Sequence, residues 1–319
     1  MIDPPEAPPT RPRARGQRLS LAVGALIGAA GLVFVVRALW SDRDAVREAL
    51  AELRPELLFT AVVLAVLAMS SIGLAWRSLL VDVGAQVSRR SALRSYFVGQ
   101  LGKYVPGGAW AVIGRGEWAR REGVSRLAAY NTVALSMISA YTAAALLVAV
   151  LVPVSGMIDG DARVYGLVLL LLPAGLLLMH PRVMSALVVL LRRLTGRTLG
   201  FEPPPWQTSM LLVLRQVPSW VAIGAVNVVL ARALGWSPDV LDVISATAVA
   251  WIVGFLAVPV PGGIGVREAV FVAVVATLAP GPAAALALTS RLVFVVADVA
   301  GAVLFTAALG VRRSSGGAP

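Results

Sequence analysis

Residues 100–117 read QLGKYVPGGAWAVIGRGE, a polar, helix-breaking stretch that lies between long hydrophobic segments. Pro106 has no backbone N–H to donate, and Gly107 and Gly108 each cost about 1 kcal/mol relative to alanine inside a helix. The stretch therefore does not form one continuous membrane-spanning helix. It fits a hairpin of two half-helices that is broken at membrane depth and shielded by protein, where the freed backbone groups find partners.

The same device occurs again 155 residues later, because residues 105–108 and 260–263 both read VPGG. The helix-breaking residues of the second copy are Pro261, Gly262 and Gly263. The charged residues that follow the two copies are Arg115 with Glu117 and Arg267 with Glu268. Interrupted segments in corresponding positions of two halves are the best sequence indication of a transporter-like binding site.

The composition identifies an all-α integral membrane protein. The chain of 319 residues is 58% hydrophobic and 14% charged, with a mean hydropathy of +0.82. Soluble domains carry about 25% charged residues. Cysteine is absent, which excludes disulfides and thiolate metal sites, and the single histidine, His180, makes a zinc site unlikely to form. No nucleophile–base pair stands out, so we expect neither an enzyme nor a bound metal or cofactor.

The basic residues lie between the apolar runs, a distribution typical of membrane orientation rather than of nucleic-acid binding. The net charge is +11, and 27 of the 28 basic residues are arginine. The one lysine, Lys103, comes three residues before Pro106. In the layout given next, the cytoplasmic pieces hold 18 Lys and Arg residues and the external pieces only three.

The layout that this asymmetry favours has six transmembrane helices, two re-entrant helical hairpins and both termini in the cytoplasm. The expected spans are 20–40, 57–81, 127–152, 163–180, 208–234 and 283–309. The expected hairpins are about 92–120 and 243–278, the second turning outside at 279–282. Residues 1–19 form a disordered basic tail, 20–311 the membrane domain and 312–319 a second tail. In a rival layout the second broken segment crosses completely, which places Arg312 and Arg313 outside.

Two parts of this layout run in opposite directions through the membrane. Residues 57–152 hold a span, a hairpin and a span, and residues 208–310 hold the same series in the reverse orientation. This arrangement is an inverted repeat, the architecture of many transporters.

The breaks and the intramembrane charges form the candidate binding site. A returning half-helix directs its unpaired N–H groups inward and favours anions, phosphates included. Arg267 and Glu268 lie close to one break, and Arg291 and Asp298 flank the midpoint of the last span. Such charges normally face a cavity or a partner. Two interpretations remain open: the charges contact a substrate, or Glu268 pairs with Arg291 or Arg267 only to hold the hairpin.

The motifs LGKYVPGGAW (101–110), the GVS turn at 123–125 and PVPGGIGVREA (259–269) resemble the lysylphosphatidylglycerol synthase transmembrane-region family. That family includes the flippase-like membrane domain of the bacterial multiple peptide resistance factor as well as stand-alone proteins. The resemblance implies a lipid-headgroup translocase fold in the bacterial cell membrane. It does not imply synthase activity, because the aminoacyl-transferase domain would follow Gly310. Many relatives carry a Glu-Arg pair where residues 131–141 read NTVALSMISAY.

We therefore expect a flippase-like translocator of a phosphate-bearing lipid, either an aminoacylated phospholipid or a polyprenyl-phosphate-linked sugar. The alternative is a non-catalytic membrane subunit that partners a glycosyltransferase or a lipid synthase. The membrane lipid is the expected ligand in both cases. The candidate binding residues are Lys103, Pro106, Gly107, Gly108, Arg115, Pro261, Gly262, Gly263, Arg267, Glu268, Arg291 and Asp298.

The layout makes a prediction about the turn at 279–282. In intact cells, an Ala279→Cys variant is expected to react with a membrane-impermeant maleimide added from outside, because the second hairpin opens there. The wild-type chain has no cysteine to give background. Ser88→Cys, in the basic loop, should react only after the cells are permeabilised. Labelling of Ala279→Cys from the cytoplasmic side alone would contradict the layout.

Overall fold

A computed structural model describes residues 33, 36–37, 40–41, 43–51, 53–104, 110–151, 162–195, 203–257 and 261–314. Every regular element in these residues is a helix, and none of them forms a strand. The predicted tail at 1–19, most of the predicted span at 20–40 and the first Pro-Gly-Gly break lie outside the described residues. The all-α fold class is confirmed for the part of the chain that is described.

Four described helices are long and apolar enough to cross a membrane. They are α3 (Pro55–Asp82), α6 (Arg126–Leu151), α9 (Trp206–Ala233) and α12 (Pro280–Ser314), the last through its apolar part Pro280–Ala307. A bilayer core about 30 Å thick needs about 20 apolar residues, and each of these helices supplies them. The four match predicted spans closely. The chain is a multi-pass membrane protein.

A bent pair of helices adds a fifth candidate span. α7 (Ala162–Met179) and α8 (Pro181–Thr195) meet at His180, and their adjoining parts are inclined by 74°. Pro181 produces the bend because a proline disfavours the helical conformation of the residue before it. α7 coincides with the predicted span at 163–180. The described residues thus hold four candidate spans, or five if the bent pair crosses as one.

Each segment predicted as a hairpin contains two helices and a 3-10 turn. The first comprises α4 (Arg89–Leu101), the 3-10 turn η1 (Gly102–Tyr104) and α5 (Trp110–Arg121). The second comprises α10 (Val240–Leu256), the 3-10 turn η3 (Pro261–Gly263) and α11 (Val266–Val274). With 12 and 9 residues, α5 and α11 extend only about 18 and 14 Å, too short to cross the bilayer core alone.

The starts of the hairpins are capped in the same way. The Ser88 hydroxyl accepts a hydrogen bond of 3.1 Å from the Ser91 N–H at the start of α4. The Asp239 carboxylate accepts one of 2.8 Å from the Asp242 N–H at the start of α10. Serine and aspartate are favoured here because their side chains satisfy N–H groups that lack an intrahelical partner. The local sequence therefore sets where each first limb begins.

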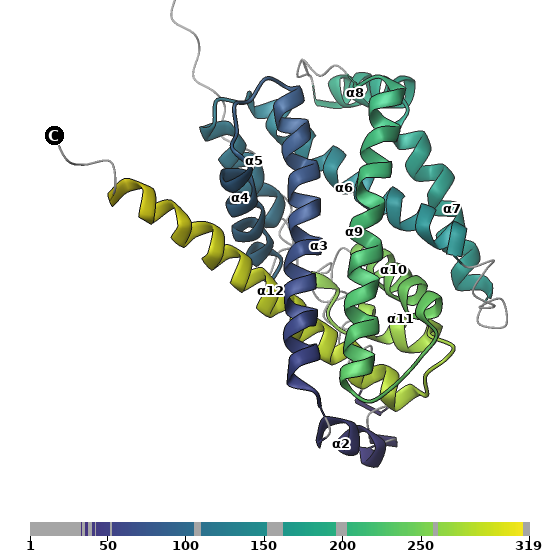
Figure 1. Ribbon diagram of the computed structural model, residues 1–319. Helices are drawn as coiled ribbons and strands as arrows, with labels where there is room; N and C mark the ends of the chain where they lie inside the picture. The colour runs from purple at the N-terminus through teal and green to yellow at the C-terminus, as the bar shows by residue number, and fades with distance from the viewer. Residues whose placement is uncertain are drawn as a thin grey trace, which may run out of the picture.

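The packing of the helices follows one scheme in the two halves of the chain. α3 and α9 pack together at the centre of the molecule (Figure 1). α6 packs on α9, and α12 packs on α3. The first limbs cross over to the opposite half, because α4 packs against α12 and α10 against α6. Each of these contacts in one half thus has a counterpart in the other.

The two hairpins lie toward opposite ends of the molecule. In Figure 1, α4 and α5 are near the end that carries α8, whereas α10 and α11 are nearer the end that carries α2 (Arg43–Ala51). Their broken ends meet in the middle, where η1 contacts η3. A Cβ on Gly262 would lie 3.4 Å from the carbonyl oxygen of Lys103. Chain segments about 160 residues apart therefore come together at the two breaks.

The last helix begins earlier than predicted. We expected an external turn at 279–282 and a span from residue 283, but α12 starts at Pro280. Proline is tolerated in the first turn of a helix because its missing N–H has no partner there in any case. The turn before α12 is tied down by Asp242, whose carboxylate accepts hydrogen bonds of 3.0 Å from the Ala276 N–H and 2.8 Å from the Thr277 N–H.

The second break requires glycine, which leads to a stability prediction. Gly263 has a φ of 65°, and a Cβ on it would lie 2.9 Å from the Gly254 carbonyl oxygen. Gly263→Ala is therefore expected to lower the free energy of unfolding by about 2–3 kcal/mol, from strain and from the close contact. Gly235→Ala is the matched control, because Gly235 has a φ of 78° but nothing within 4 Å of the added Cβ.

Thermal unfolding in detergent measures both variants. Gly235→Ala carries the strain alone and should be clearly less destabilised than Gly263→Ala. Equal destabilisation would show that the close approach of Gly263 to α10 is not a constraint.

Candidate functional site

A cavity of about 410 Å³ lies where the two hairpins meet. Residues of α3, α4, α5, α6, α9, α10, α11 and α12 line it, so both halves of the chain contribute to its wall. Four basic side chains face it, and all four are predicted site residues: Lys103, Arg115, Arg267 and Arg291. Its lining also includes the predicted glycines Gly262 and Gly263. Such a volume falls in the range of about 300–1,000 Å³ that is usual for small-molecule sites.

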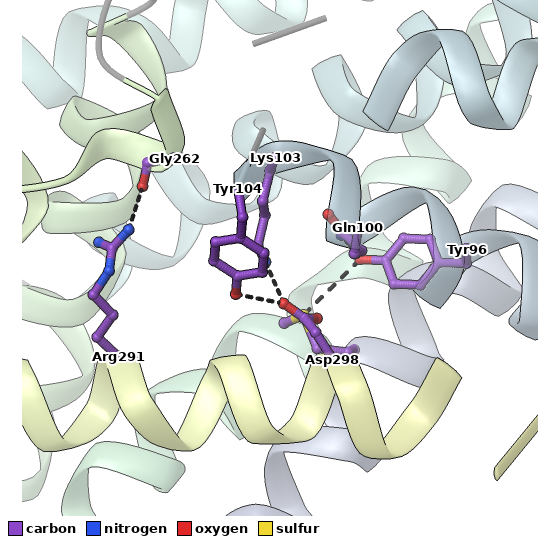
Figure 2. A network of polar contacts seen from close by, with 8 residues as sticks. Tyr96, Gln100, Lys103, Tyr104, Gly262, Arg291 and Asp298 are labelled. Carbon is purple, nitrogen blue, oxygen red and sulfur yellow. Dashed lines mark hydrogen bonds and ion pairs between the residues drawn. The ribbon is translucent and has the colours of Figure 1, made fainter. Parts of the chain in front are cut away.

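Lys103 forms an ion pair with α12. Its Nζ lies 2.7 Å from Oδ2 of Asp298, and the Tyr104 hydroxyl donates a hydrogen bond of 2.8 Å to the same oxygen (Figure 2). Asp298 has no exposed surface, and the Lys103 side chain is 24% exposed. A carboxylate buried in this way needs a paired cation and hydrogen-bond donors. Asp298 thus fixes the chain just before the first break.

Arg291 forms the second ion pair, seven residues earlier on the same helix. Its Nη1 lies 2.6 Å from Oε1 of Glu268. Its Nη2 donates a hydrogen bond of 3.4 Å to the Gly262 carbonyl (Figure 2). The other carboxylate oxygen, Oε2, accepts a hydrogen bond of 2.7 Å from the Gly265 N–H. Both oxygens of Glu268 are therefore engaged, one in the ion pair and one at the start of α11.

Arg115 has a different environment. The residue is only 4% exposed, and its Nε donates a hydrogen bond of 3.3 Å to the Ala111 carbonyl within α5. Its guanidinium carbon lies 5.7 Å from the ring centre of Trp76 and 5.6 Å from that of Tyr96. No carboxylate among the described residues lies within 4 Å of its nitrogen atoms.

Arg267 has the same kind of environment in the other half. Its guanidinium carbon lies 3.9 Å from the ring centre of Trp251 and 5.4 Å from that of Phe294. The part of the chain that the structure describes offers it neither an ion pair nor a hydrogen bond. Its neighbour Glu268 pairs with Arg291 instead. The structural interpretation expected Glu268 to pair with Arg291 or Arg267, and the structure pairs it with Arg291, which leaves Arg267 without a carboxylate among the described residues.

Glycine on the opposite limb makes room for each of these arginines. A Cβ on Gly99 would lie 2.9 Å from Cγ of Arg115, and a Cβ on Gly254 would lie 3.0 Å from Cβ of Arg267. The aromatic residues near the two guanidinium groups come from the same first limbs as these glycines, Tyr96 from α4 and Trp251 from α10. Each hairpin thus holds an arginine against its first limb, beside an aromatic ring.

A sequence signal for this arrangement exists, although the sequence analysis did not use it. Residues 96–108 read YFVGQLGKYVPGG, and residues 251–263 read WIVGFLAVPVPGG. Each stretch begins with an aromatic residue, has Val-Gly at its third and fourth positions and ends in VPGG, so the two match in the same register. Extending the comparison upstream of VPGG would have identified Tyr96, Gly99, Trp251 and Gly254. By contrast, Tyr141 of α6, which also lines the cavity, has no counterpart that the repeat could reveal.

The remaining predicted site residues are placed as follows. Pro106, Gly107 and Gly108 lie outside the described residues, so the first break is not seen. Pro261 belongs to η3, beside the cavity glycines. No three His, Asp or Glu side chains in the described ranges gather closely enough to hold a metal ion. The arrangement can instead bind an anion, because guanidinium groups bind carboxylate or phosphate in a bidentate manner.

The fold and the cavity define a multi-pass α-helical membrane protein with an arginine-lined cavity between two interrupted segments. The family of the lysylphosphatidylglycerol synthase TM region matches residues 19–302. The chain belongs to this family, as its motifs had indicated, and the family is one of membrane domains related to lipid handling. The comparison with curated proteins finds no match.

The buried ion pair of α11 and α12 gives a prediction. Glu268→Gln is expected to lower the free energy of unfolding by about 3–5 kcal/mol, because it leaves Arg291 as an unpaired, largely buried charge. Thermal unfolding in detergent measures the loss. The exposed pair of Glu117 with Arg120, 2.7 Å long, supplies the control Glu117→Gln, which should change stability little.

The double variant Glu268→Gln/Arg291→Gln separates the lost pair from the stranded charge. It should recover part of the stability, since no unpaired charge remains. A double variant no more stable than Glu268→Gln would show that the hydrogen bond to Gly265, rather than the ion pair, is what matters.

Proposed function

We propose that the protein translocates a phosphate-bearing membrane lipid, and that Arg115 and Arg267 hold the phosphate in the cavity. The observation that carries this proposal is the pair of guanidinium groups that line one cavity from two hairpins, each without a carboxylate partner among the described residues. The membership of a family of lipid-related membrane domains supports it.

The energetics of buried charge favour a ligand over a purely structural role. A charged side chain near the bilayer centre costs about 2.5–3.5 kcal/mol on insertion scales. Stacking on an aromatic ring returns about 0.5–2 kcal/mol, which offsets only part of that cost. Lys103 and Arg291 are neutralised by carboxylates, whereas Arg115 and Arg267 are not. A phosphate anion would neutralise them.

The topology that we propose for transport is the predicted one. It has six spans and two re-entrant hairpins in an inverted repeat, with both termini on the cytoplasmic side of a bacterial plasma membrane. The matched packing of the two halves and the hairpins that lie toward opposite ends of the molecule support it (Figure 1). In such repeats the substrate lies at the interface of the halves, and rocking of one half against the other exposes it alternately to each side.

This function is that of a carrier and not of an enzyme. The cavity offers cations and aromatic faces, and the described part of its lining contains no carboxylate or histidine that would act as a general base. A lipid that binds here would therefore leave chemically unchanged. The non-catalytic subunit of a glycosyltransferase or lipid synthase remains the alternative, and it differs in requiring lipid binding without translocation.

Removal of either arginine tests the proposal. In proteoliposomes that contain a labelled phospholipid, Arg267→Gln and Arg115→Gln are each expected to reduce translocation to the background rate, because each removes a charge-assisted contact to the phosphate. The control is Arg215→Gln, since Arg215 is an exposed residue of α9 that does not line the cavity.

The melting temperature of each variant is measured in parallel. If Arg267→Gln and Arg115→Gln translocate at the wild-type rate, or lose activity only because they unfold, the phosphate site is wrong. If the wild-type protein binds lipid but never translocates it, the subunit alternative gains support.

A further inference from the structure

We propose, resting on the lipid-binding role above, that the natural ligand is a lipid phosphate with about two negative charges and no amine. Phosphate monoesters and diphosphates share this chemistry. Aminoacylated phospholipids, whose headgroups carry at least one ammonium group, are excluded. The proposal thus chooses between the two lipid classes that the sequence left open.

The charges at the cavity wall are not balanced. Among the described residues, four basic side chains line the cavity and no acidic side chain does. Glu268 and Asp298 stand behind the wall, 3% and 0% exposed, where they neutralise Arg291 and Lys103. The two segments at the breaks that the structure does not describe, 105–109 and 258–260, contain no ionisable residue. Two positive charges therefore remain for the ligand to balance.

The described wall of the cavity offers no partner for an ammonium group. Such a group needs a carboxylate, and Glu268 already engages both its oxygens. Oδ2 of Asp298 accepts from Lys103 and Tyr104. Oδ1 of Asp298 has no partner among the described residues, yet the residue has no exposed surface through which a ligand could reach it. An aminoacyl headgroup would bring into the cavity a further positive charge for which the described wall offers no carboxylate.

The rest of the described wall is largely aromatic and apolar. Tyr141 of α6 stacks on Phe255 with ring centres 3.9 Å apart, and both line the cavity with Trp220 and Trp251. Tyr141 lines the same cavity as Arg115 and Arg267. The wall therefore suits a doubly charged phosphate whose remaining part is uncharged, such as a glyceride, a polyprenol or a sugar.

A competition experiment tests the proposal with full-length protein in detergent. Radiolabelled short-chain phosphatidic acid is displaced by unlabelled phosphatidic acid, farnesyl diphosphate, phosphatidylglycerol, phosphatidylethanolamine or lysylphosphatidylglycerol. Phosphatidic acid and farnesyl diphosphate should each bind at least about tenfold more tightly than phosphatidylglycerol, because the additional negative charge on the phosphate strengthens the hydrogen bonds that it accepts from the arginines. Lysylphosphatidylglycerol should not compete.

Each outcome of the competition has a meaning. Stronger displacement by phosphatidic acid indicates a monoester, and stronger displacement by farnesyl diphosphate indicates a diphosphate; both support the proposal. Equal displacement by phosphatidylglycerol or by lysylphosphatidylglycerol overturns it, as does an absence of phosphatidic acid binding. Binding must also be lost in Arg115→Gln and Arg267→Gln and kept in Arg215→Gln.

The pH dependence of binding gives an independent test. A phosphate monoester loses its second proton near pH 6, whereas a phosphodiester does not titrate in this range. The titratable groups that face the cavity are Lys103, Arg115, Arg267, Arg291, Tyr96, Tyr104 and Tyr141. These residue types ordinarily titrate well above pH 8, and the two carboxylates behind the wall are ion-paired. The affinity for phosphatidic acid should therefore rise between pH 5 and pH 7.5, and that for phosphatidylglycerol should stay constant. A flat profile for both contradicts the proposal.

A charge added to the wall completes the test. Met137 of α6 lines the cavity, and Met137→Glu supplies one negative charge there, while Met137→Gln has the same shape without the charge. Met137→Glu should weaken phosphatidic acid binding about tenfold and narrow its preference over phosphatidylglycerol. Met137→Gln should keep both. Equal effects of the two variants would show that charge does not set the selectivity. If Met137→Glu fails to fold, Ala140→Asp and Ala140→Asn place the same contrast on the same helix.

The experiments distinguish a failure of this inference from a failure of the proposed function. Selective binding of doubly charged lipids without translocation supports this inference and contradicts the carrier role. Translocation of phosphatidylglycerol and lysylphosphatidylglycerol at the same rate as phosphatidic acid supports the carrier role and contradicts this inference.

Discussion

The structure depends on two ion pairs that one helix makes with both chain breaks. α12 presents Arg291 and Asp298 seven residues apart, about 10 Å along the helix axis and on one face. Asp298 binds Lys103 before the first break, and Arg291 binds Glu268 after the second. A broken helix in an apolar environment leaves backbone groups and charges that no lipid can satisfy. α12 satisfies them from one side and joins the two halves of the chain.

The pairs also separate the charges that hold the structure from those that are free to bind. Because Glu268 is engaged by Arg291 and by the Gly265 N–H, it does not neutralise the adjacent Arg267. Arg267 instead lies over Trp251, just as Arg115 lies near Tyr96. An aromatic face stabilises a guanidinium group without using its N–H donors. The arginines are therefore held in position while their donors stay free for an anion.

Close backbone approach is the second condition for the cavity. Gly99 and Gly254 lie under the two arginine side chains, and any larger residue would displace them from the aromatic rings. Gly263 turns the chain with a positive φ directly against Gly254. Small residues at helix contacts are usual in membrane proteins, where packing replaces the hydrophobic effect as the force that brings helices together. Here they also shape the site.

The sequence by itself determined the class of the protein, the approximate extents of the long helices and the position of the second break. These features depend on local properties: runs of about 20 apolar residues, and prolines and glycines that a helix cannot include. It also identified all four cavity cations, since Lys103 and Arg267 stand beside the breaks and charges are rare in such segments. Only the tertiary structure decided which acid pairs with which base. Lys103 and Asp298 are 195 residues apart, so their contact follows from the packing of α4 on α12 and not from any local pattern. The same holds for Tyr141 and Phe294, whose apolar neighbours make them indistinguishable in sequence from ordinary core residues. A local pattern reports which side chains a helix offers, and the packing of distant helices decides which of them face the same cavity.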